Sequence, residues 1–385
     1  MQDSPSFAEY SILALCLCLG ALSTALASPL YSIYVLSWKI STSQIGYAFI
    51  AYMFGVVFTL LFLNGWISRF GYKTTVIRGL VISILGLVCS AYASDIWQLC
   101  AARFLIGISS GLLCTATVIG LAHKYPFERP SQAGKISSLL TVLGFGLGPI
   151  LGGLMADHSA LPLFTPYIVI AVISTFALIA CYFIQAPVVK KTASGIRLWS
   201  PPVAPDERRL FWICSVIGAC CFAAFSLYAA LAGTFLHALP LSPSATLTGA
   251  SISLILLVSF LSQLFSKYLN EITCLKVGGI ALVLGCFSLF LAQWSEQLPF
   301  LALSVLLMGI GHGLSLNPAY FFMSKLAEKQ QSGVFSSFLL VAYQGTIWPI
   351  LLSSLIIDYF NVLTSVAVFS GLILLLISWV WTQLP

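Results

Sequence analysis

The sequence GISSGL at residues 107–112 returns as GIGHGL at residues 309–314. Two further pairs lie at nearly the same spacing: GxxSS at residues 134–138 and 333–337, and GPIL at residues 148–151 with WPIL at residues 348–351. All three pairs are offset by 199 to 202 residues. Chance matches between apolar segments would differ in offset, whereas a duplication fixes it. The sequence therefore predicts two similar halves.

The composition places this chain in a lipid bilayer. Of its 385 residues, 59% are hydrophobic and only 7% are charged, whereas a soluble protein carries about 25% charged residues. The apolar runs are near twenty residues long, as a helix needs to cross about 30 Å of hydrocarbon, and their continuity excludes a β-barrel with alternating polarity. Twelve spans are predicted, at residues 11–36, 45–63, 74–94, 96–122, 135–156, 167–186, 210–239, 244–266, 277–294, 299–323, 333–357 and 362–382.

The fold class expected is therefore an all-α membrane protein with twelve transmembrane helices in two pseudo-symmetric six-helix bundles. The domains are predicted at residues 1–186 and 210–385, joined by a basic cytoplasmic linker at residues 187–209 that contains Lys190, Lys191 and Arg197. Threading the spans from a cytoplasmic N-terminus places fifteen of the seventeen Lys and Arg residues on one side. The positive-inside rule then predicts that both termini are cytoplasmic.

These charges are spread over short loops, which does not favour a nucleic-acid surface. The eleven cysteines lie mostly within spans and form no CxxC pair with distant histidines, so neither a metal, a cofactor nor a disulfide framework is expected. The leading segment carries Asp3 and Glu9 and no basic residue, which favours a first helix over a cleaved signal peptide.

Two motifs give this architecture a family resemblance. The loop NGWISRFGYK at residues 64–73 contains Arg69, Gly71 and Lys73, and RFLIGISSG at residues 103–111 places an arginine four and eight residues before glycines. With twelve helices and a charged linker, these motifs resemble the major facilitator superfamily over essentially the whole chain. That family usually has an aspartate where this chain has Ser68.

A third motif lies in the fifth predicted span, and it resembles the one associated with exporters that exchange substrate for protons. Its residues are Gly144, Gly148, Pro149, Gly152 and Gly153. The four-residue spacing puts three glycines on one helical face, which allows a neighbouring helix to approach closely. We expect a kinked contact between the halves that serves as a hinge or seal, and ordinary helix packing is the alternative.

Among the ionisable side chains, Arg103 and His312 lie deepest in the spans, whereas no acid lies well inside any span. An intramembrane charge is costly, which makes both residues functional candidates. An unperturbed histidine titrates near pH ~6.5, so His312 is the predicted proton carrier, with Arg103 as a fixed charge that assists coupling. The alternatives are structural: a neutral His312 bonded to serine, Asn317 or carbonyl groups, and Arg103 paired with Asp95 or carbonyl groups.

A weakly polar, aromatic substrate cavity is predicted from six side chains: Tyr31, Tyr34, Tyr52, Asn317, Tyr343 and Gln344. Tyrosines near span ends also serve as interface anchors, which is the alternative for each of them. The repeat partners Asp157 and Asp358 lie at the predicted extracytoplasmic ends of two spans. They are expected either to cap the gate or to be acids that this side of the membrane tolerates.

The function expected is secondary active transport of a small organic molecule across the bacterial inner membrane by proton-coupled efflux, with the protein acting as a monomer. Its partners would be the small-molecule substrate, protons and the lipid bilayer. An importer or uniporter with the same fold is the first alternative, because no membrane carboxylate is present and Ser68 replaces the usual acid. An intramembrane enzyme or a sensor is the remote alternative, since such enzymes need paired catalytic groups inside the spans.

Overall fold

The computed structural model describes residues 7–63, 65–125, 132–185, 203–204, 207–240, 244–330 and 333–384. Within these ranges the regular structure is entirely helical, and twelve segments are long and apolar enough to cross a membrane. The all-α prediction with twelve spans is therefore confirmed. The linker cations Lys190, Lys191 and Arg197 lie outside the described residues.

The first six spans are made of seven α-helices and two short segments. They are α1 (Phe7–Ala25), η1 (Ser28–Leu30), α2 (Tyr31–Trp38), α3 (Thr42–Phe58), the π-helical η2 (Thr59–Leu63), α4 (Trp66–Ala91), α5 (Ile96–His123), α6 (Gln132–Asp157) and α7 (Thr165–Tyr182). The second six are α8 (Arg208–His237), α9 (Ala245–Phe265) with the 3₁₀ turn η3 (Ser266–Tyr268), α10 (Glu271–Ser295), α11 (Leu298–Gln330), α12 (Gly333–Tyr359) and α13 (Val362–Gln383).

Several helices begin at a residue whose side chain accepts the orphan amides of the first turn, as expected for an N-cap. Asp95 accepts from two amides of α5, and Ser244, Asn270 and Asn361 each accept from one amide of α9, α10 and α13. These polar residues sit at the breaks between apolar runs. The same breaks marked the predicted span ends.

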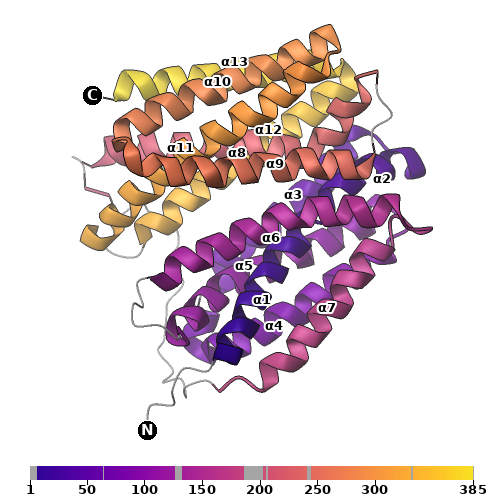
Figure 1. Ribbon diagram of the computed structural model, residues 1–385, viewed down its shortest axis with the longest axis vertical. Helices are drawn as coiled ribbons and strands as arrows, with labels where there is room; N and C mark the ends of the chain where they lie inside the picture. The colour runs from indigo at the N-terminus through magenta and orange to yellow at the C-terminus, as the bar shows by residue number, and fades with distance from the viewer. Residues whose placement is uncertain are drawn as a thin grey trace. The chain divides into compact units, whose positions relative to one another are not determined.

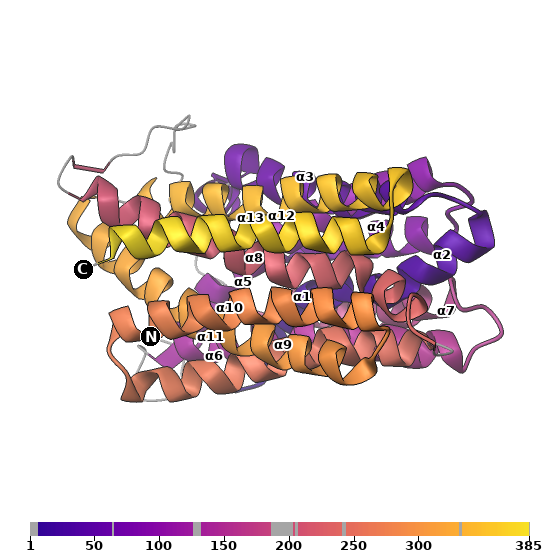
Figure 2. The ribbon, with the colours of Figure 1, turned by 90° about the horizontal axis from the view of Figure 1, so that it is seen from above.

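The chain forms two compact units. Unit 1 comprises Met1–Leu30 and Ala51–Leu198, and unit 2 comprises Tyr31–Ile50 and Trp199–Pro385. In unit 1, α1 packs against α5, α6 and α7, and α4 packs against α5 and α7. In unit 2, α10 packs against α11, and α13 (yellow) lies alongside α10 and α12 (Figures 1 and 2). Residues 31–50 thus pack with helices of the second half of the chain.

The repeated glycines make close helix contacts in both units. A Cβ atom added to Gly107 of α5 would meet the Tyr52 carbonyl oxygen, and one added to its repeat partner Gly309 of α11 would lie 2.7 Å from Val258 and 2.8 Å from the Ile255 carbonyl oxygen. A Cβ atom added to Gly111 would lie 2.7 Å from the Thr59 side chain, and one added to its repeat partner Gly313 would meet the Ser259 carbonyl oxygen. The duplicated glycines therefore seat α5 on the α3–η2 span and α11 on α9. The predicted internal repeat has a packing counterpart.

Candidate functional site

Arg103 lies in α5 and is almost fully buried, with 1% of its surface exposed. Its Nη1 donates a 2.9 Å hydrogen bond to the Thr24 carbonyl oxygen of α1, and its guanidinium lies 5.2 Å from the centroid of the Tyr52 ring. Asp95 instead accepts the Trp97 and Gln98 amides at 2.8 and 2.9 Å. Of the two structural partners expected for Arg103, the structure therefore shows a carbonyl group.

Tyr52 extends this cluster, because its hydroxyl interacts with the Ser110 and Thr24 side chains. Arg103, Tyr52 and their partners thus join α1, α3 and α5 around one buried positive charge. A guanidinium cannot lose its proton in a protein. The cluster in unit 1 is therefore a fixed charge held by a carbonyl dipole and an aromatic face.

His312 lies in α11 of unit 2 and is also buried, with 7% of its surface exposed. Its Nδ1 is 2.8 Å from the Ser259 hydroxyl of α9, and Gln263 Nε2 donates to the same hydroxyl oxygen at 3.3 Å. The imidazole ring lies 6.1 Å from the Phe225 ring of α8. Asn317, an expected partner of His312, instead donates to Ser266 at 2.7 Å.

The Gln263–Ser259–His312 chain links α9 to α11. The amide nitrogen of Gln263 can only donate, so the Ser259 oxygen accepts that bond, and both its own proton and its second lone pair remain for the imidazole. In the tautomer that carries its proton on Nε2, neutral His312 accepts the Ser259 proton at Nδ1. If His312 gains a proton at Nδ1, it becomes the donor, and the Ser259 proton must turn to another acceptor. Protonation would therefore rearrange the contact between α11 and α9.

Repeat symmetry relates the two clusters. His312 occupies the position of Ser110 in the duplicated sequence. Ser110 interacts with Tyr52 of α3, and His312 bonds to Ser259 of α9. The same helix contact thus holds a neutral group in unit 1 and an ionisable group in unit 2.

The glycine face of α6 packs against α1 in the same unit. A Cβ atom added to Gly148 would lie 2.7 Å from the Leu22 carbonyl oxygen, and one added to Gly144 would lie 2.5 Å from that of Cys18. Gly152 meets the Leu26 carbonyl oxygen in the same way, and Pro149 and Gly153 are buried. The sequence led us to expect the other half of the chain as neighbour, and the structure places α1 there.

The basic loop motif forms a sharp kink at the start of α4. Gly71 has φ 81° and ψ 163°, a conformation almost restricted to glycine. Arg69 is exposed, and its guanidinium lies 5.2 Å from the Phe70 ring centroid. Ser68, at the usual aspartate position, donates to the Gly65 carbonyl oxygen at 2.9 Å. The motif glycine is thus required by the backbone.

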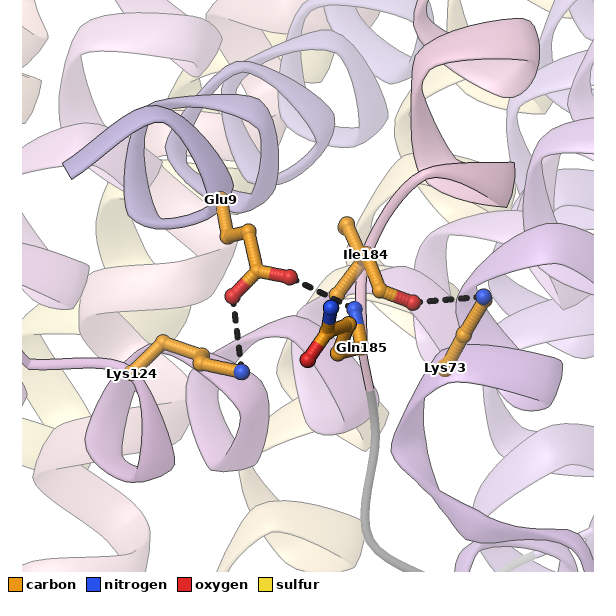
Figure 3. A network of polar contacts seen from close by, with 5 residues as sticks. All are labelled: Glu9, Lys73, Lys124, Ile184 and Gln185. Atoms are coloured by element: carbon orange, nitrogen blue, oxygen red, sulfur yellow. Dashed lines mark hydrogen bonds and ion pairs between the residues drawn. The ribbon is translucent and has the colours of Figure 1, made fainter. Parts of the chain in front are cut away.

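Lys73 belongs to a network of charges at one end of unit 1 (Figure 3). Its Nζ donates to the carbonyl oxygens of Tyr182 and Ile184 at 2.9 and 2.5 Å, which caps the end of α7. Beside it, Glu9 of α1 forms a 2.7 Å ion pair with Lys124. Glu9 also accepts the Gln185 amide at 2.5 Å. The network therefore fastens the beginning of α1 to the ends of α5 and α7.

Glu9→Gln is expected to lower the thermal unfolding midpoint by about 1–3 °C, because a partly exposed ion pair contributes about 1 kcal/mol at most. Thermal melts in detergent would measure this. A double-mutant cycle with Lys124→Met supplies the control. Strictly additive effects of the two substitutions would show that the pair does not stabilise unit 1.

The predicted cavity residues are divided between the two units. Tyr52 lies in unit 1, whereas Tyr31, Tyr34, Asn317, Tyr343 and Gln344 lie in unit 2. Tyr31 and Tyr34 are buried, and the Tyr343 ring lies 5.4 Å from that of Phe222. Asn317 and Gln344 are exposed, and Gln344 accepts a 3.0 Å bond from the Trp348 indole.

Sequence reasoning missed Ser259 and Gln263, the partners of His312. They stand four residues apart in the apolar run of α9, which places them on one helical face. That spacing is the only sequence feature that could have indicated these two partners of His312. Among the described residues, no group of three His, Cys, Asp or Glu side chains could hold a metal ion.

A sequence profile described as Major Facilitator Superfamily matches residues 13–350. The multidrug resistance protein MdtG of Salmonella choleraesuis (strain SC-B67) is 30% identical over 156 residues, which are 37% of this chain and 38% of that protein. The match therefore spans well under half of this relative.

Solved structures of low sequence identity share the fold. A POT family transporter in complex with 5-aminolevulinic acid superposes with a TM-score of 0.79 at 12% identity, over 99% of this chain and 98% of that one. A mutant of the nucleoside transporter NupG gives a TM-score of 0.78 at 15% identity, over 98% of this chain and 100% of that one.

Proposed function

This chain belongs to the major facilitator superfamily, and we propose that it is a proton-coupled exporter of small, mainly apolar or weakly charged organic molecules. It is a multi-pass membrane transporter. The observation that carries the proposal of export is the glycine–proline face of α6, packed on the carbonyl groups of α1. This face resembles the motif of exporters that exchange substrate for protons, and the partial match to MdtG supports the same direction.

Proton coupling is assigned to His312. It is a buried, titratable group on a helix of unit 2, and its hydrogen-bond partner Ser259 stands on a different helix. Uptake of a proton would reverse that bond and so alter the α9–α11 contact. Arg103 would act in unit 1 as a permanent charge that holds α1, α3 and α5 together and opposes a second cation nearby. Substrate and proton would then bind to the transporter alternately.

We place the protein in the bacterial inner membrane as a monomer with both termini in the cytoplasm, on the basis of the positive-inside pattern. In this orientation the network of Glu9, Lys73 and Lys124 is cytoplasmic. Asp358, at the end of α12, is extracytoplasmic. Alternating access would move the two bundles against each other around the solute route, as in related transporter folds.

Flux in proteoliposomes tests the proposal. A panel of weakly charged fluorescent dyes is first screened for accumulation in cells that lack or overproduce the protein. For a dye that is exported, an imposed pH gradient is expected to accelerate flux in proteoliposomes. A flux that ignores the gradient would contradict antiport and favour a uniporter.

His312→Ala is expected to remove the dependence of flux on the pH gradient. Ser259→Ala should lower gradient-driven flux by about tenfold, because a hydrogen bond to a charged group is worth about 1.5 kcal/mol or more. Ser365→Ala is the matched control, since it removes a buried hydroxyl of unit 2 that bonds to the Ser353 carbonyl oxygen. An unchanged pH dependence in His312→Ala would exclude His312 as the proton carrier.

A further inference from the structure

The N-terminus of α3 is capped by its own residues only in part. Ser41 donates its amide to the Gln44 side chain at 2.9 Å, and the Gln44 amide lies 3.4 Å from the Ser41 hydroxyl. This reciprocal pair is a capping box. The amide of Ile45 already points to the Ser41 carbonyl oxygen at 3.4 Å. The first two amides of the helix, those of Thr42 and Ser43, need another acceptor.

Asp358 supplies that acceptor from the far end of the sequence. Its Oδ1 accepts the Thr42 amide at 2.9 Å, and its Oδ2 accepts the Ser43 amide at 2.8 Å. A carboxylate at a helix N-terminus gains both charge-assisted hydrogen bonds and the favourable end of the helix dipole. One side chain of α12 thereby completes the amide pairing of α3, 315 and 316 residues away in sequence.

Two close packing contacts accompany this bond within unit 2. A Cβ atom added to Gly46 of α3 would lie 2.6 Å from the Ser354 hydroxyl of α12, one turn before Asp358. A Cβ atom added to Gly233 of α8 would lie 2.8 Å from Ser32 of α2. We call these three contacts the latch: Asp358 with Thr42 and Ser43, Ser354 with Gly46, and Gly233 with Ser32.

The latch residues of α2 and α3 are covalently continuous with unit 1. Residues 31–50 pack in unit 2, yet they continue directly into Met1–Leu30 and Ala51–Leu198 of unit 1. If α1 and α3 move as bodies with the rest of the first half, the latch must part. We infer that the latch closes the extracytoplasmic side of the carrier, and that Asp358 is the gate residue that releases α3 in each transport cycle. This inference rests on alternating access and not on export or proton coupling.

The exposure of the bond suits it to repeated opening. Asp358 is exposed and Thr42 is half-buried, whereas Ser43 is buried, so water can take over the carboxylate and the Thr42 amide when they separate. The Ser354 hydroxyl that meets Gly46 already donates to the Leu351 carbonyl oxygen, so this contact contributes shape without a bond that must be remade. The latch is therefore specific when closed, and its outer donor and acceptor pair with water when open.

Two substitutions break the same bond from opposite sides. Asp358→Ala removes the acceptor. Thr42→Pro removes one donor but keeps the helix, because proline is favoured at the first helical position and the capping residue Ser41 precedes it. Val362→Pro is the matched control, since it changes the first residue of α13, where Asn361 caps through the Thr364 amide.

Opening of the latch is measured at Ser32, away from the bond between Asp358 and the α3 amides. Ser32→Cys introduces a thiol against Gly233, and a membrane-impermeant maleimide added from outside reports its exposure. The protein without Ser32→Cys gives the background labelling of the native cysteines. Asp358→Ala and Thr42→Pro are each expected to speed labelling about tenfold, and the double variant no further, because both act on one bond. Val362→Pro should label at the reference rate.

The competing outcome is that Asp358 only caps α3. Hydrogen exchange at residues 42–45 would then rise in Asp358→Ala while labelling at Ser32→Cys stayed at the reference rate, and the latch would be refuted. Faster labelling at Ser32→Cys together with dye flux that ignores a pH gradient would keep the latch and reject proton coupling. The two proposals therefore fail separately.

Discussion

Gly148→Leu is expected to stop transport, and Gly148→Ala to reduce it by about tenfold or more, because α6 lies against the backbone of α1 at this residue. The Cβ of an alanine would lie 2.7 Å from the Leu22 carbonyl oxygen and 3.0 Å from the Ala25 methyl group. A backbone oxygen cannot rotate away as a long side chain can, so the helices must separate. Overpacking of this kind costs about 1–3 kcal/mol. Dye flux in proteoliposomes and thermal melts measure the two effects.

Gly146→Ala is the control for this prediction. Gly146 lies one-half turn away in the same helix, and a Cβ atom there would meet nothing within 4 Å. The two variants make the same change in helix propensity and in side-chain volume. Equal loss of flux in both would show that α6 needs glycine for flexibility and that close packing on α1 is irrelevant.

The sequence predicted this face but could not predict its neighbour. Glycines at positions 144, 148 and 152 identify a surface of close approach because their spacing matches the helix period. The other side of the contact consists of backbone carbonyl oxygens at Cys18, Leu22 and Leu26. Every residue has such an oxygen, so the accompanying Ala21 and Ala25 methyl groups, four residues apart on α1, are the one side-chain feature of the partner face.

In the candidate site, too, some residues could be predicted from the sequence whereas their partners could not. Arg103 and His312 stood out because an ionisable group inside a span is rare. Ser259 and Gln263 did not, because isolated hydroxyl and amide groups are tolerated in membrane helices for many reasons. The bond from Asp358 to Thr42 links two sequence regions 316 residues apart. Its acid was noticed through repeat symmetry, whereas its partners are backbone amides with no signature of their own.

Arg103→Ala is expected to be the most damaging substitution at a charged residue. It removes a buried donor from the Thr24 carbonyl oxygen and a cation from the face of Tyr52, two contacts that tie α5 to α1 and α3. A hydrogen bond from a charged group is worth about 1.5–3 kcal/mol, and a desolvated cation–π contact about 2 kcal/mol. We expect a large fall in the thermal unfolding midpoint and loss of flux. Melts and proteoliposome assays on the same preparations measure both.

Arg103→Lys separates charge from shape. It keeps a positive group but loses the planar guanidinium that can bond to a carbonyl oxygen while lying near an aromatic ring, so partial flux is expected. Arg209→Ala is the matched control, because Arg209 also donates to a backbone carbonyl oxygen, that of Gln383, but in an exposed position. That variant should melt within about 2 °C of the parent protein. Full flux in Arg103→Ala would exclude a coupling role for the buried charge, since water or a rearranged donor would then satisfy Thr24 equally well.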